Sequence, residues 1–504
     1  MSSSLNTWRR AAGLLLVALI MLPSAVVRAQ QTGTPVPQET PPPPAAPRSV
    51  NVPKPDEKTL KNGLRIVVIE DHDVPIISAQ LLVKNGGEID PPQLSGLADM
   101  TASLLTKGTK TRSAPEIAEQ IEALGGAIES GAGWDASRAS INVMSPRIEP
   151  ALVILADISR NPVFHDEEIE RLRQQYLDSL SVTLRQPGAL ASLVAGRVVF
   201  GDAAYGHPVN GTPESLARIK RADIVGLHSQ FYRPDNAVLV LGGDIKVADA
   251  FRLAERIFGD WVKPTAPLSG RGMVGKMINP DEKQRVVVVD MPDAGQAAVV
   301  LARAGISRND PDYFQGIVTN AVLTGYSGRL NQEIRIKRGL SYGAASRLDT
   351  RRDAGPFVAS AQTKNSSGAE VASLLVGELG RLSNEPVAAA ELVPRKAVLT
   401  GGFGRALETT EGLVGQIASL SLNGLSLSEV NNYISNVQAV TPAEIQKFAS
   451  ERISVKNANI IIVGSAKDFL EPLRKQFPNV EVIPIADLDL NSATLRKNAA
   501  AMNK

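Results

Sequence analysis

An internal repeat constrains the fold of this sequence more than any other feature. Asn236 and Asn457 each follow a helix-like stretch and begin an apolar run that ends in a glycine, Gly243 in the first copy and Gly464 in the second. The two asparagines are separated by 221 residues, and so are the two glycines. A repeat of this length is typical of whole domains, so the sequence predicts two homologous halves of about 200 residues each.

Each half combines short apolar runs with longer helical patterns. The β-branched run at 64–69 has a counterpart at 285–289, and the runs at 76–83 and 297–302 are also apolar enough to be strands. Helical patterns in the first half cover 93–105, 114–124, 149–160 and 166–184. Because these elements do not follow a strict β-α-β order, the sequence predicts an α+β fold, with helices packed on a largely antiparallel sheet in each half.

The N-terminus has the features of an export signal. Arg9 and Arg10 precede an apolar run at 11–22, and residues 27–29 match the pattern of a cleavage site. The apolar run is shorter than the ~20 residues that span a bilayer, which favours a cleaved signal over a membrane anchor. No later stretch is long and apolar enough to span a membrane. We therefore expect an exported protein with a periplasmic location.

Composition shifts mark the boundaries between the predicted parts of the chain. The segment after the signal is rich in Pro, Thr and Gln, which is typical of an extended linker, and Pro and Gly also cluster between the two halves. The predicted organisation is a signal peptide (1–29), a Pro-rich linker (30–55), an N-terminal domain (56–262), an inter-domain linker (263–281), a C-terminal domain (282–490) and a tail (491–504).

The composition excludes several kinds of site. The 504 residues include no cysteine, so the chain has no disulfides, thiol nucleophiles or thiolate metal ligands. Its net charge is +2 and only 4% of its residues are aromatic, whereas a nucleic-acid partner would favour a basic domain. We expect no nucleic-acid partner.

The segment from Gly96 to Thr109 has the sequence G-L-A-D-M-T-A-S-L-L-T-K-G-T. It resembles the active-site helix of the pitrilysin/insulinase (inverzincin) family of zinc peptidases, which has the pattern G-L-A-H-x-x-E-H-x-x-x-K-G-T. In that family the two His bind Zn²⁺ and the Glu activates the metal-bound water. Asp99, Ala102 and Ser103 stand at the positions of the first His, the Glu and the second His.

The resemblance also covers the segment that supplies the family's further zinc-binding Glu. Residues 170–180 are similar to that helix, and Ser179 stands at the ligand position with Asp178 beside it. An aspartate without imidazole partners makes a poor zinc site, so we interpret the first half as metal-free. No two of the four histidines have ligand spacing, and we interpret them as surface or loop residues: His72, His165, His207 and His228.

In the second half, the segment from Gly328 to Tyr342 resembles the family's substrate-binding segment. Active relatives have an Arg and a Tyr spaced seven residues apart there, and Arg335 and Tyr342 match this spacing. A guanidinium and a phenol can both donate hydrogen bonds to a substrate carbonyl or to the oxyanion that forms from it. The alternative is that Arg335 is a solvated charge on a helix and Tyr342 is a core residue.

The resemblance implies a division of labour between two chains. In some bacterial members one chain has the zinc motif and the other has the Arg/Tyr pair, and this chain has only the second set. The first hypothesis is a non-catalytic, substrate-positioning subunit that holds no cofactor itself. It would bind peptides and depend on a paralogous partner that supplies the zinc.

Two alternatives remain open at this point. The chain can be a structural or peptide-binding scaffold with no role in proteolysis, because the loss of the zinc ligands fits that function equally well. An active peptidase with an unusual site would need a metal held by Asp99 and other oxygens, and it would have no base at Ala102. We expect no activity from the chain alone.

Overall fold

The computed structural model describes residues 51–268 and 283–497, and all of them belong to one compact unit, Ala46–Lys504. The predicted signal peptide lies outside the described residues, as do most of the Pro-rich linker and most of the predicted inter-domain linker. Within the described ranges, no helix is both long and apolar enough to cross a bilayer.

The first half contains a six-stranded sheet in the order β1-β2-β6-β3-β5-β4. Its strands are β1 (Asp56–Thr59), β2 (Arg65–Glu70), β3 (Ile76–Val83), β4 (Ala127–Ala132), β5 (Ser137–Met144) and β6 (Ala237–Gly243). Only the β2–β6 pair is parallel. The helices of this half are α2 (Leu97–Ser103), α3 (Ala114–Ala123), α4 (Ile148–Arg160), α5 (Asp166–Thr183), α6 (Pro187–Phe200), α7 (Pro213–Arg218), α8 (Arg221–Phe231) and α9 (Val247–Phe258).

The second half has a six-stranded sheet in the order β12-β7-β11-β8-β10-β9. Its strands are β7 (Val286–Asp290), β8 (Ala297–Ala304), β9 (Ala344–Leu348), β10 (Pro356–Thr363), β11 (Asn459–Gly464) and β12 (Val480–Pro484). Its helices are α10 (Tyr313–Leu323), α11 (Arg329–Asn331), α12 (Gly368–Asn384), α13 (Ala389–Leu407), α14 (Thr410–Leu422), α15 (Glu429–Ala439), α16 (Pro442–Arg452) and α17 (Leu470–Gln476).

The two sheets confirm the predicted repeat and the α+β class. Strands β2, β6, β3, β5 and β4 follow the same spatial order as β7, β11, β8, β10 and β9. The parallel β2–β6 pair matches the parallel β7–β11 pair, and the remaining matched pairs are antiparallel in both halves. The halves differ at one edge, where β1 pairs antiparallel with β2 but β12 pairs parallel with β7.

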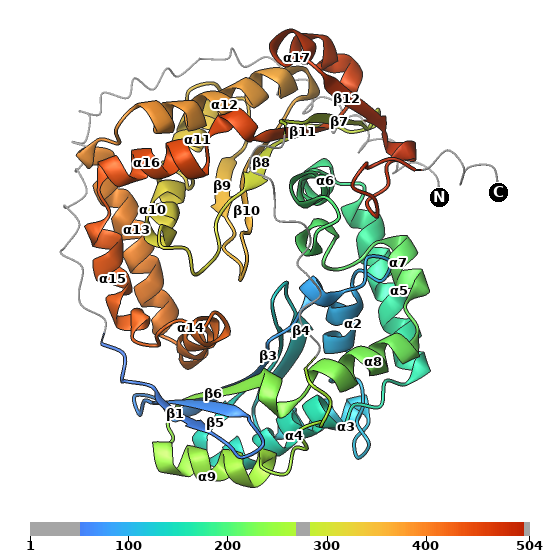
Figure 1. Cartoon of the computed structure of the whole chain (residues 1–504), viewed down its shortest axis with the longest axis vertical. Helices are drawn as coiled ribbons and strands as arrows, with labels where there is room; N and C mark the ends of the chain where they lie inside the picture. The colour runs from blue at the N-terminus through green and yellow to red at the C-terminus, as the bar shows by residue number, and fades with distance from the viewer. Residues whose placement is uncertain (1–50, 269–282, 498–504) are drawn as a thin grey trace, which may run out of the picture. The chain divides into compact units, whose positions relative to one another are not determined.

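Each half contributes one helix to the other half's sheet (Figure 1). Leu190 and Val194 of α6 pack in one apolar cluster with Ile461 of β11 in the second half. Val414 of α14 packs in the same way with Val240 of β6 in the first half. Central strands of both sheets are therefore apolar on both faces, because one face contacts helices of its own half and the other contacts the exchanged helix.

The motif helix begins later than the sequence pattern predicts. The pattern covers 93–105, whereas α2 starts at Leu97, after Gly96 in a left-handed conformation with φ of 91°. The buried Asp90 carboxylate fixes this start, since it accepts hydrogen bonds from the backbone amides of Gly96 and Ala98 at 2.8 Å each. A carboxylate at a helix N-terminus satisfies amides that would otherwise lack partners.

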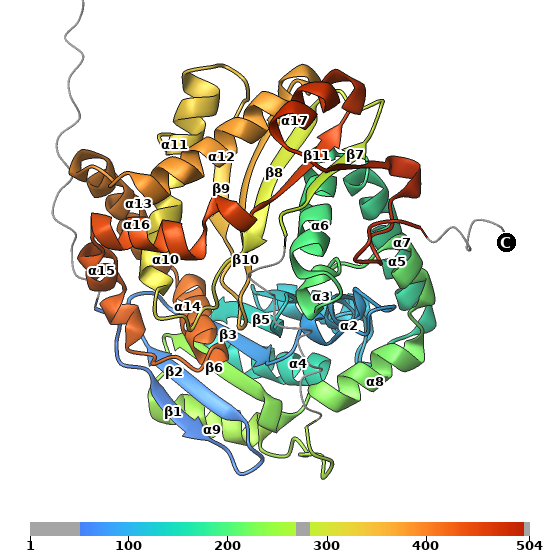
Figure 2. The ribbon, with the colours of Figure 1, turned by 45° about the horizontal axis from the view of Figure 1, so that its top comes forward.

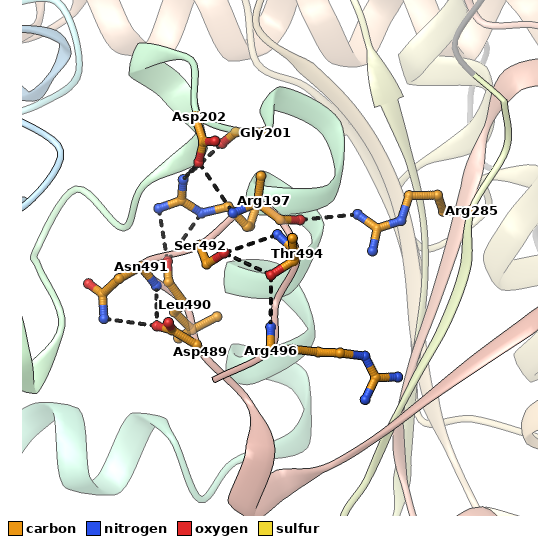
Figure 3. A network of polar contacts seen from close by, with 11 residues as sticks. Arg197, Gly201, Asp202, Arg285, Asp489, Leu490, Asn491, Ser492, Thr494 and Arg496 are labelled. Atoms are coloured by element: carbon orange, nitrogen blue, oxygen red, sulfur yellow. Dashed lines mark hydrogen bonds and ion pairs between the residues drawn. The ribbon is translucent and has the colours of Figure 1, made fainter. Parts of the chain in front are cut away.

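The segment that follows β12, residues 485–497, packs against the first half (Figure 3). Arg197 of α6 is buried and donates from Nε and Nη2 to the carbonyl oxygen of Leu490, at 3.1 and 2.8 Å. Asp202 accepts a hydrogen bond from the amide of Ala493. On the other side, Arg285 of the second half donates to the carbonyl oxygen of Ala493. The segment that follows β12 therefore ties the two halves together, as does α6 itself (Figure 2).

Candidate functional site

The degenerate motif forms a hydrogen-bonded cluster around Asp99 on α2. Asp99 is buried, and its Oδ2 accepts hydrogen bonds from the side-chain amide of Asn210 at 2.7 Å and from the hydroxyl of Tyr176 at 3.0 Å. Its Oδ1 accepts a longer hydrogen bond, at 3.4 Å, from the amide of Ala132 at the end of β4. Burial raises the pKa of Asp99, although these donors oppose the shift.

Tyr176 connects the positions of the two lost histidine ligands. It lies on α5, and its hydroxyl donates to Asp99 Oδ2 while lying 2.9 Å from Ser103 Oγ. Burial, together with the nearby Asp99 charge, raises the pKa of Tyr176, so the phenol stays protonated. A hydroxyl that bridges residues 99 and 103 therefore joins α2 to α5. The family pattern contains no signal for this role, so it could not be predicted from the sequence.

The donor set does not fit the zinc ion that the family motif implies. The oxygens of Asp99 already accept three hydrogen bonds, and Ser103 is bonded to a neutral phenol. Ala102 is fully buried and has no group that could act as a base. Zinc sites in proteins use His, Cys or carboxylate ligands, and no group of three such side chains in residues 51–268 and 283–497 could hold a metal ion.

Asp99 and Ser179 line one cavity of about 590 Å³, which we call the inter-half cavity. Its wall in the first half comes from α2, α5, α6 and the loop around Asn210, and its wall in the second half comes from β8, β9 and β10. Of the four residues at the family's zinc-site positions, Asp99, Ala102, Ser103 and Ser179, the structure therefore brings two, Asp99 and Ser179, to the cavity. Ser103 does not line this cavity but is hydrogen-bonded to Tyr176, which does, and Ala102 lies in the core.

His207 lies in a loop, as predicted, but it is not a surface residue. Its side chain is buried, and its ring packs edge-on against Trp134 with the ring centroids 5.3 Å apart. Burial lowers the pKa of His207 to about 4, and the cations of Arg197 and Arg351 lower it further. The imidazole is therefore neutral near pH 7. The interpretation as a surface or loop residue is wrong for His228, which lies half-buried on α8, where burial lowers its pKa to about 4.

Arg335 and Tyr342 line a second cavity, of about 800 Å³, which we call the Arg335 cavity. The segment that carries Arg335 consists of α11 followed by a π-helical turn, Gln332–Ile336, and Gly339, with φ of 65°, follows it. The Arg335 guanidinium lies 5.5 Å from the ring centroid of Tyr326. Tyr342 is 90% exposed, so the alternative that it is a core residue is wrong.

A buried contact between the halves lies in the loop that joins β9 to β10. Arg352 donates from Nη2 to the carbonyl oxygens of Lys84 and Asp135, at 2.9 and 2.6 Å. Its Nη1 lies 3.5 Å from Glu88 Oε1, and both side chains are almost completely buried. Burial raises the pKa of Glu88 to about 7, although hydrogen bonds from Gly86 and the Arg352 charge oppose the shift.

Replacing Tyr176 by phenylalanine should lower the free energy of unfolding of the isolated chain by about 1–2 kcal/mol. The change removes a donor to Asp99 and leaves Ser103 without its partner, while the ring and its packing remain. Urea unfolding measures the effect, and Tyr342→Phe is the control because that hydroxyl is exposed. An unchanged free energy of unfolding in the Tyr176 variant would contradict the bridging role.

Two models of one peptidase family match the chain and together cover more than half of it. The model described as "Insulinase (Peptidase family M16)" matches residues 65–193, and the model described as "Peptidase M16 inactive domain" matches residues 218–399. Each model falls mainly within one half, and the first includes α2, α5 and all of the cluster around Asp99 except Asn210.

Similar proteins include several uncharacterized zinc proteases of bacteria. One from Streptomyces coelicolor is 25% identical over 418 residues, which covers 81% of this chain and 89% of that protein. One from Rickettsia bellii is 26% identical over 417 residues, covering 80% of this chain and 96% of that protein.

Among solved structures, a peptidase M16 inactive domain from Pseudomonas fluorescens has a TM-score of 0.75 and 25% identity. The match covers 81% of this chain and 98% of that one. A protease from Helicobacter pylori has the same fold, with a TM-score of 0.75 and 21% identity, and the match covers 82% of this chain and all of that one. The chain therefore belongs to peptidase family M16, as a member without the family's zinc-binding residues.

Proposed function

We propose that this chain is the non-catalytic, substrate-positioning subunit of a heteromeric zinc metallopeptidase that acts on peptides. The observation that supports this function best is the placement of Arg335 and Tyr342. Both line one cavity, Tyr342 is almost fully exposed, and the Arg335 guanidinium contacts the Tyr326 ring, with no ion pair among the described residues. Two hydrogen-bond donors on a shared cavity wall favour substrate binding over a purely structural role.

The partner in this proposal is a paralogous subunit with an intact zinc motif. It would supply the zinc ion and the general base, which the first half of this chain cannot supply because Asp99 and Ser103 are engaged with Tyr176. Arg335 and Tyr342 would donate hydrogen bonds to the scissile carbonyl as negative charge develops on its oxygen. We also propose that the chain works in the periplasm, because its N-terminal sequence has the pattern of an export signal.

The isolated chain tests the non-catalytic half of this proposal. The purified mature protein, dialysed with zinc and then freed of unbound metal, should retain no stoichiometric zinc and should not hydrolyse peptides. Adding a zinc-motif paralogue should give hydrolysis, and the same paralogue with its motif Glu changed to Gln should not. Stoichiometric zinc together with hydrolysis by this chain alone would overturn the proposal.

A further inference from the structure

The inter-half cavity and the Arg335 cavity meet along β9. The segment from Ser341 to Ala345 lines the Arg335 cavity, and the segment from Ala345 to Asp349 contributes to the wall of the inter-half cavity. Ser192 of α6 and Ser360 of β10 also line both cavities. The two cavities therefore form one trough, with α6 on one side and the β9–β10 part of the second sheet on the other.

The trough exists because α6 covers only part of this sheet. It packs mainly on β8 and β11, and the neighbouring face of β10 and β9 remains accessible. Burial alternates along β9, so Ala345 and Arg347 are exposed while Ser346 is buried. The residues where the cavities meet, Ser192, Ala345 and Ser360, are all small, which leaves room for another chain.

The dimensions of the trough fit an extended peptide. The strand that lines it, β9, runs from Ala344 to Leu348, and the chain bends at Tyr342 before it. At about 3.3 Å per residue the five residues of β9 are roughly 16 Å long, which corresponds to about five residues of a bound strand. The inter-half cavity is large enough for a bulky side chain, since its walls enclose about 590 Å³.

The chemistry of the trough favours an apolar side chain close to a carboxylate. Apolar residues of both halves line the inter-half cavity: Leu180, Leu193, Val199, Phe200 and Val358. The Arg347 side chain is 79% exposed and lies 3.8 Å from Asp349, but Asp349 is already held by Arg351 at 2.8 Å. Arg347 is therefore a cation with a weak partner at the edge of an apolar cavity.

We propose that this trough binds one extended peptide segment of about five residues. A large apolar side chain of the peptide fills the inter-half cavity, and a nearby carboxylate meets Arg347. The carboxylate belongs either to an acidic side chain or to the C-terminus. The inference extends the proposed substrate-positioning role, because Arg335 and Tyr342 line the same trough. Peptide binding here requires no zinc subunit, so it is tested on this chain alone.

The test is fluorescence anisotropy with the full mature chain and labelled ten-residue peptides. The reference peptide contains one Phe followed by one Glu and has an amidated C-terminus. Replacing Phe by Ser should weaken binding about tenfold or more, the effect expected for burial of one aromatic side chain. If an acidic side chain of the peptide meets Arg347, replacing Glu by Gln should weaken binding. If the peptide C-terminus meets Arg347, the Gln peptide should regain affinity when its C-terminal carboxylate is left free.

Two substitutions at exposed residues of the protein test where the peptide binds. Ser192→Trp fills the junction of the cavities and should weaken binding of the reference peptide at least tenfold, whereas Ser181→Trp on α5 should not. Arg347→Glu should weaken binding of carboxylate-containing peptides only, and Arg138→Glu on β5 is its matched control. Equal affinity for the Phe and Ser peptides, no effect of Ser192→Trp, or no binding by the wild type would overturn the inference. None of these results would change the expectation that peptide hydrolysis appears when the zinc subunit is added.

Discussion

Replacing Arg335 by alanine is expected to lower kcat/KM of the reconstituted two-chain peptidase by a factor of about 100 to 1,000. This range is typical for loss of one donor to a developing oxyanion. Tyr342→Phe, which removes only the hydroxyl, should lower kcat/KM by about 100 for the same reason. Most of the loss should appear in kcat, because the hydrogen bonds strengthen as charge develops in the transition state.

Two further variants separate this role from a general charge effect. Arg335→Lys should recover only part of the activity, since an ammonium keeps the charge but lacks the planar fork of donors. Lys337→Ala, two residues away, removes an exposed cation that pairs with Glu333 and should leave kcat/KM unchanged. The Arg335 and Tyr342 variants should unfold at the wild-type temperature. Wild-type kcat/KM in both would contradict substrate positioning and would favour the scaffold alternative.

Replacing Arg352 by methionine is expected to lower the free energy of unfolding at pH 8 by about 3–5 kcal/mol. The change keeps much of the alkyl packing but leaves Glu88 as a buried charge without its cation. It also removes the donors to the carbonyl oxygens of Lys84 and Asp135. Chemical denaturation measures the loss, and Arg474→Met is the control because its ion pair with Glu471 is exposed.

The pKa of Glu88 sets the pH dependence of this effect. Its folded-state pKa of about 7 lies above the ordinary value of 4.5, so Glu88 favours the folded state at low pH. That contribution falls as the pH rises from about 4.5 to about 7. Without Arg352 the pKa rises further, so the variant should lose less stability at pH 6 than at pH 8. Adding Glu88→Gln should restore part of the loss at pH 8. An equal loss at both pH values would contradict the ion-pair account.

The repeated architecture could be predicted because its offset is constant and each strand or helix is indicated by residues within one segment. The strand expected at 76–83 is observed as β3 with the same bounds, and the helix expected at 114–124 is α3, Ala114–Ala123. Alternating or periodic apolar residues and an N-terminal Ser or Thr are signals within single segments. The start of α2 was misplaced because it depends on the buried side chain of Asp90.

Contacts between distant residues could not be predicted in the same way. Arg352 and Lys84 are 268 residues apart, and nothing near either residue indicates the hydrogen bond that joins them. The packing of α6 and α14 on the sheet of the opposite half could not be predicted for the same reason, because both helices have ordinary apolar sequences. The family pattern located Asp99, Ser103 and Arg335, but it could not indicate that Tyr176 would bridge the first two.

The most direct test of the central claim is a titration of this chain into a fixed concentration of its zinc-bearing paralogue, with peptide hydrolysis as the readout. Neither protein alone should hydrolyse the peptide. Activity should rise linearly and reach a plateau at one equivalent of this chain. Hydrolysis that is already maximal with the paralogue alone, or that increases with this chain in the absence of the paralogue, would contradict the proposed division of labour.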